Sequence, residues 1–119
     1  MRYEIKKITK MIDEVTNYFL YTYECETEIS VVPKEDEYVI SFFFKGLTPD
    51  EKDLKRLKNT MKAGRDPALT NYYWQLTGEI ESGNELSLVA MMCDDVIFDQ
   101  RNDGLSLVLV RKFIDVKSK

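Results

Sequence analysis

The chain has 119 residues, 44% of them hydrophobic and 32% charged, which excludes a disordered chain and allows one globular domain with its own core. Its 17 basic and 21 acidic residues are interleaved and give a formal net charge of −4, which argues against a nucleic-acid surface. The absence of histidine excludes catalytic triads, zinc sites and phosphoacceptors that depend on this residue.

Cys25 and Cys93 are too few for a disulfide framework or a four-cysteine zinc site. The N-terminus is basic and polar and does not resemble a secretion signal. No apolar run approaches the roughly 20 residues of a membrane span. We therefore expect a soluble, cytoplasmic protein without membrane contact.

Residues 2–24 have the spacing of an amphipathic helix. The apolar stripe that we expect to face the core consists of Ile5, Ile8, Ile12, Val15, Phe19 and Tyr23. A second, polar stripe points almost opposite and consists of Lys10, Glu14, Asn17 and Tyr21. Most polar helix faces only contact water. However, the carboxylate of Glu14 and the carboxamide of Asn17 lie one turn apart on this stripe and could bind one ligand together.

The next elements predict a hairpin and a surface helix. Residues 27–33 and 38–44 are rich in β-branched and aromatic residues and are separated by a charged turn, which is typical of two paired strands. Thr48, Pro49 and Glu51 then form a helix start, with the threonine as its cap. That helix runs to about residue 63 with one narrow apolar stripe, and its lysines and arginines form a solvated face or steer an acidic partner.

The second half predicts a short aromatic helix over 68–76, a buried helix over 85–93, and a hairpin of strands 95–100 and 105–113. The apolar pattern of residues 85–93 is also compatible with a strand. Residues 116–119 are expected to fray. The whole chain is thus expected to be a single α+β domain. It should form a two-layer sandwich, with four mostly antiparallel strands and helices on one face.

Three segments occur in the order of motifs from a known family. The stretch from Asp13 to Tyr23 reads DEVTNYFLYTY, residues 44–48 read FKGLT, and residues 83–96 read GNELSLVAMMCDDV. They resemble, respectively, the asparagine-bearing helix, the strand-end Asp-x-Gly-x-Gly motif and the Gly-x-Gly-Leu motif of the anti-sigma regulatory factors of bacteria. This family is the serine-kinase-like branch of the GHKL ATPase superfamily, and the resemblance implies a truncated histidine-kinase-like ATPase fold.

The resemblance implies roles for a few residues of an intact site. Asn17 would bind the Mg²⁺ that bridges the phosphates of ATP. Glu14, one position after the family's glutamate, would act as a base, although the spacing of the family motif assigns that role to Asp13. Gly46 and Gly83 match family glycines next to the nucleotide. Mg-ATP would then be the cofactor, and the protein an active serine kinase or ATPase.

Two departures from the motifs predict that nucleotide binding is weak or lost, so we expect no cofactor and more regulation than catalysis. Phe44 replaces the aspartate that accepts a hydrogen bond from adenine, and the loss of such a buried partner costs about 1–3 kcal/mol. Glu85 replaces a lid glycine and brings negative charge to the place of the triphosphate.

The leading hypothesis from the sequence is a regulatory domain that binds a protein, either a sigma factor, an antagonist or another copy of itself. Tyr72, Tyr73 and Trp74 are its candidate contact residues, because tyrosine and tryptophan are frequent at interfaces, although they also suit a core. One alternative is the active kinase or ATPase with an adenine pocket rebuilt around Phe44. The other is an unrelated homodimeric α+β module.

Overall fold

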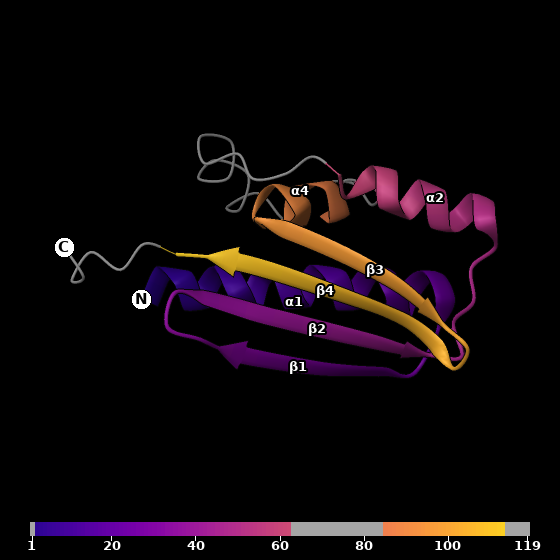
Figure 1. Ribbon diagram of the computed structural model, residues 1–119, viewed down its shortest axis with the longest axis horizontal. Helices are drawn as coiled ribbons and strands as arrows, with labels where there is room; N and C mark the ends of the chain where they lie inside the picture. The colour runs from indigo at the N-terminus through magenta and orange to yellow at the C-terminus, as the bar shows by residue number, and fades with distance from the viewer. Residues whose placement is uncertain (1, 63–84, 114–119) are drawn as a thin grey trace.

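A computed structural model of the chain describes residues 2–62 and 85–113 (Figure 1). Its elements, in chain order, are α1 (Arg2–Tyr23), β1 (Thr27–Pro33), β2 (Glu37–Lys45), α2 (Glu51–Thr60), α4 (Glu85–Met91), β3 (Asp95–Arg101) and β4 (Gly104–Lys112). The predicted α+β class and each predicted element within the described residues are confirmed. The helix predicted over 68–76 and the frayed end at 116–119 lie outside them.

The four strands form one antiparallel sheet in the order β1-β2-β4-β3. The hairpin from β3 to β4 turns over two residues and brings Arg101 opposite Gly104. Gly104 has a φ of 154°, and a Cβ atom there would collide with the carbonyl oxygen of Phe44 and the ring of Phe43. Glycine is therefore required at position 104, the first residue of β4, which lies against the end of β2.

The core lies on one side of the sheet only. On β2 the side chains of Ile40, Phe42 and Phe44 are buried, and the alternate residues are only partly covered, as expected of a strand with one packed face. On β4 the leucines 105, 107 and 109 face the same way, and buried residues of α1, α2 and α4 join them in one cluster. We call the opposite side, which no described helix covers, the open face (Figure 1).

Helix α1 buries a stripe that differs from the predicted one. Ile8, Val15 and Phe19 are buried as expected, but Ile5 is 53% exposed and Glu14 is only 4% exposed, so both of these expectations were wrong. The reason is that α1 packs against α4 as well as against the sheet. A helix with two neighbours buries a wider stripe than one that packs on the sheet alone, and here that stripe includes Met11 and Glu14.

The start of α2 also differs from the prediction. Asp50, and not Thr48, is the N-cap, and its carboxylate accepts a hydrogen bond of 2.8 Å from the backbone N–H of Asp53. Both residue types are good caps, but an aspartate next to the first turn also interacts favourably with the positive end of the helix. The helix therefore begins two residues later than its sequence signals suggested.

A buried ion pair ties the first turn of α1 to the end of β4. Arg111 is 1% exposed, and its guanidinium donates to both carboxylate oxygens of Glu4, at 2.8 and 3.2 Å. It also donates to the carbonyl oxygen of Met92 at 2.6 Å, just after α4. One cation thus joins three elements and satisfies a carbonyl group at the end of a helix.

Glu4→Ala should lower the free energy of unfolding by about 2–3 kcal/mol, because it leaves the buried guanidinium of Arg111 without its carboxylate. Urea unfolding monitored by circular dichroism measures the change. The matched control is Asp99→Ala, which removes an exposed ion pair with Arg101 and should cost less than about 1 kcal/mol. Equal losses in the two variants would contradict the central role of Arg111.

Candidate functional site

The two polar residues of α1 that the family resemblance singled out face different surroundings. Glu14 is buried and lies 3.6 Å from the ammonium group of Lys10. Asn17 is exposed, and its side-chain nitrogen donates to Asp13 at 3.2 Å. The carboxylate thus faces the protein interior while the carboxamide faces solvent, so the described geometry does not bring the two together around one ligand.

Phe44 occupies the core at the end of β2. Its side chain is fully buried, and its ring stacks on that of Phe19 with centroids 4.0 Å apart and planes at 15°. The ring of Phe42 stacks from the same strand with a centroid distance of 6.1 Å. The position that corresponds to the adenine-reading aspartate of the family is therefore filled by an aromatic stack between the sheet and α1.

Of the three remaining positions from the family motifs, Gly46, Gly83 and Glu85, the structure describes only Gly46 in full. Gly46 has a φ of 71°, and its N–H donates to the carbonyl oxygen of Asp103 at 2.8 Å, so the turn after β2 by itself requires a glycine. Gly83 lies outside the described residues. Glu85 is the first residue of α4, and the position of its side chain also lies outside what the structure describes.

The described part of the chain contains no group of three or more histidine, cysteine, aspartate or glutamate side chains that could hold a metal ion. None of the helices in this part is both long and apolar enough to cross a membrane. The aromatic candidates Tyr72, Tyr73 and Trp74 belong to the segment outside the described residues.

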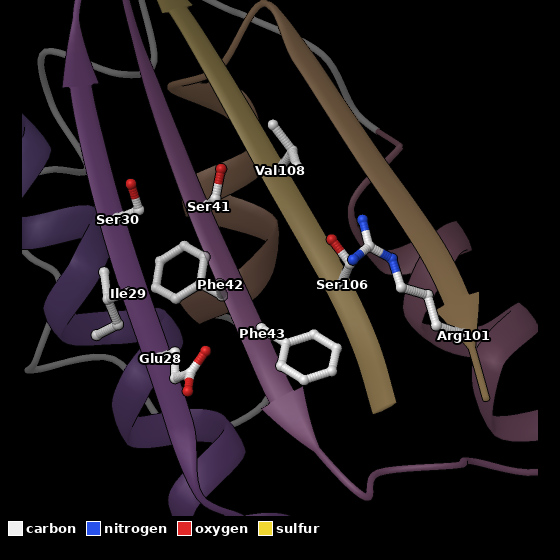
Figure 2. Close-up of a pocket in the computed structure, with 9 residues that line it drawn as sticks. All are labelled: Glu28, Ile29, Ser30, Ser41, Phe42, Phe43, Arg101, Ser106 and Val108. Carbon is white, nitrogen blue, oxygen red and sulfur yellow. The ribbon is translucent and has the colours of Figure 1, made fainter. Parts of the chain in front are cut away.

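The open face contains a shallow hollow of about 360 Å³ that the sequence did not single out (Figure 2). Glu28, Phe43 and Arg101 line it from three different strands, together with the serines 30, 41 and 106. The guanidinium of Arg101 lies 6.0 Å from the centre of the Phe43 ring and pairs with Asp99 at 3.2 Å. Ile29, Phe42 and Val108 also line it, so the hollow is open and of mixed polarity. Such a surface suits contact with another protein better than enclosure of a small molecule.

A second hollow, of about 500 Å³, lies between α2 and the outer edge of β3. Its rim consists of the exposed lysines 55, 58 and 62, and its floor of Val96, Ile97 and Phe98. We call it the basic groove. The sequence showed the lysines as one helix face, but it could not show that an apolar strand runs beside them, because β3 follows α2 by more than thirty residues.

The hydroxyl of Tyr23, at the end of α1 and close to α2, has a shifted pKa. Burial raises the pKa of the Tyr23 hydroxyl above its ordinary value, Tyr18 and Asp53 raise it further, and the positive charge of Arg56 lowers it in part. The hydroxyl is buried and has no hydrogen-bond partner among the described residues. An unpaired buried hydroxyl costs stability.

The chain matches no model of a known protein family and no curated protein sequence. The resemblance to the anti-sigma regulatory factors therefore depends on the three segments quoted above. A function must be argued from the geometry of the groups just described.

Tyr23→Phe should raise the free energy of unfolding by about 1 kcal/mol at pH 7, because it removes a buried hydroxyl without a partner. The gain should grow from about pH 10 upward. There the unfolded wild type ionises Tyr23 while the folded protein keeps it neutral, so wild-type stability falls as pH rises through the folded pKa. The phenylalanine variant has no such loss.

Urea unfolding of both proteins at pH 7 and at about pH 10.5 measures the two differences. Tyr21→Phe is the control, because the ring of Tyr21 is 87% exposed and its hydroxyl is hydrated in both states. A gain that stays constant between the two pH values would contradict the raised pKa.

Proposed function

We propose that this chain is a regulatory domain that binds another protein and works without nucleotide. The observation that carries the proposal is the stack of Phe44 on Phe19, fully buried at a centroid distance of 4.0 Å. In the family that the chain resembles, the corresponding position reads adenine. A phenyl ring cannot accept the hydrogen bond of the exocyclic amine.

Rebuilding an adenine pocket at this position would disrupt the core. Phe44 would have to leave its contacts with Phe19 and Phe42, and emptying a buried phenylalanine site costs about 3–5 kcal/mol. Asn17 and Glu14 add no compensating phosphate site, since the carboxamide faces solvent and the carboxylate is buried beside Lys10. These contacts support a domain that has kept a scaffold and dispensed with nucleotide.

The basic groove supports the protein-binding half of the proposal. Its lysine rim attracts negative charge, and its floor of Val96, Ile97 and Phe98 offers apolar contact. An acidic amphipathic segment of a partner protein combines both properties. The family resemblance suggests a sigma factor or its antagonist as that partner, and the groove suggests which chemistry of the partner is recognised.

Isothermal titration calorimetry with Mg-ATP should give no saturable heat at millimolar nucleotide, because Phe44 fills the adenine position. Asn17→Ala serves as the control and should give the same trace as the wild type. Low-micromolar binding that disappears in Asn17→Ala would overturn the proposal and favour the active kinase or ATPase instead.

A fluorescein-labelled synthetic peptide with glutamate and leucine at helical spacing should bind the basic groove, more weakly as salt is added. Lys58→Glu should weaken binding about tenfold, or about 1.4 kcal/mol. The control Lys6→Glu changes net charge equally, but its lysine is exposed on α1 and should leave affinity unchanged. Fluorescence anisotropy measures both. Equal effects, or no binding at all, would contradict a role for the groove.

A further inference from the structure

We propose that two copies of this chain associate through the outer edges of their β1 strands, so that one antiparallel sheet continues across the dimer. This inference does not depend on the proposed function. It concerns the edge of the sheet opposite to the basic groove, since the strand order is β1-β2-β4-β3 (Figure 1).

The outer edge of β1 carries backbone groups that have no partner among the described residues. The N–H of Lys45 donates to the carbonyl oxygen of Glu26, and the N–H of Lys34 donates to that of Glu37. Because inward and outward backbone groups alternate along a strand, the even-numbered residues of β1 pair with β2. The N–H and C=O groups of Thr27, Ile29 and Val31 therefore point away from the sheet, where no described element lies beside them.

The side chains along this edge are apolar and exposed. Ile29, Val31 and Val32 are 41%, 40% and 43% exposed, and no charged residue lies between Glu28 and Pro33. The edge overhangs the helical layer, because α1 lies behind β2 and β4 and not behind β1 (Figure 1). A partner strand would therefore cover apolar side chains as well as backbone groups.

The other edge of the sheet is protected in the usual ways. On β3, Asp95, Asp99 and Arg101 carry exposed charges, and α2 lies alongside. Natural proteins avoid unwanted strand pairing with such charges and flanking elements. The centre of β1 has no charged residue, and no described element lies beside it. This is expected of an edge that is paired in the working form of the protein.

The strand is complementary to itself. Full antiparallel overlap of Thr27–Pro33 with a second copy places the two-fold axis at Ser30, the middle residue. Ile29 then stands opposite Val31 of the second copy, and both carry outward backbone groups that can exchange hydrogen bonds. The same register brings Glu26 opposite Lys34 of the second copy on both sides of the axis. Opposite charges in such cross-strand pairs are stabilising.

Sedimentation equilibrium of the full chain should show a reversible monomer–dimer equilibrium with a micromolar dissociation constant, as suits a small interface. Val31→Pro should weaken the dimer about tenfold or more. It removes an outward N–H and no bond to β2, and proline is tolerated at such edge positions. The control is Ile97→Lys, which charges an exposed apolar residue of β3 at the opposite edge of the sheet and should leave the dimer unchanged.

Cross-linking tests the register without disturbing the edge. In a Cys25→Ala background, Ser30→Cys places two thiols across the axis in a pair that is not hydrogen-bonded, whose Cα atoms are about 4.5 Å apart. This distance suits a disulfide, so mild oxidation should give a covalent dimer on a non-reducing gel. Ser41→Cys is the matched control, because Ser41 lies beside Ser30 on β2, one strand farther from the axis, and should stay monomeric.

Association that Val31→Pro weakens, together with cross-linking through Ser30→Cys alone, would support the proposal. A wild-type chain that stays monomeric up to about 200 μM, well above the micromolar range expected for a small interface, would overturn it. So would a dimer that survives Val31→Pro and fails to cross-link through residue 30. Failure here would not affect the nucleotide titration or the peptide experiment, which address other surfaces.

Discussion

The packing of α1 on the sheet through the stacked rings of Phe19 and Phe44 is the interaction on which the rest of the structure depends. The two rings come from the first helix and the second strand and lie 4.0 Å apart in the centre of the buried cluster. Aromatic rings contribute more buried area than any other side chains, and offset stacking adds to that burial. The same contact fills the end of β2 with the buried ring of Phe44 and leaves no space beside it.

The one-sided core determines where contact with other molecules can take place. Since the described helices all pack on one face, the sheet keeps an open face and two edges (Figure 1). Alternation along β2 and β4 directs Phe42, Phe44 and the leucines of β4 to the helices. It leaves Ser41, Ser106 and the ring of Phe43 on the open face. The surfaces available for binding are thus the direct result of the arrangement that buries Phe44.

Much of the fold could be predicted from the sequence, because each element is encoded locally. Period-two and period-3.6 patterns and turn residues gave all seven described helices and strands. What could not be predicted depends on contacts between distant residues. The bond between Glu4 and Arg111 joins positions 107 residues apart, and α1, which carries the buried Glu14, packs against α4 from the second half of the chain. Nothing near either residue in the sequence signals these partners.

In the candidate site, too, residue types could be identified from the sequence, whereas contacts between distant residues could not. That position 44 carries an aromatic residue, which cannot accept a hydrogen bond from a base, could be stated from the sequence alone. That the ring would be buried against Phe19 required the fold. The basic groove is a stronger example, because the lysines of α2 and the apolar residues of β3 meet only in three dimensions.

The arrangement of the two edges has a consequence for binding. The β1 edge and the basic groove lie at opposite edges of the sheet. Pairing through β1 would therefore leave the groove of each copy free, one at each outer edge of the continuous sheet. A dimer would then present two equivalent lysine-rimmed grooves to a partner with two acidic segments. Linked contacts of this kind bind more tightly than either contact alone when the spacing allows both to form. Such a dimer would bind this partner tightly even if each groove alone had only modest affinity for an acidic segment.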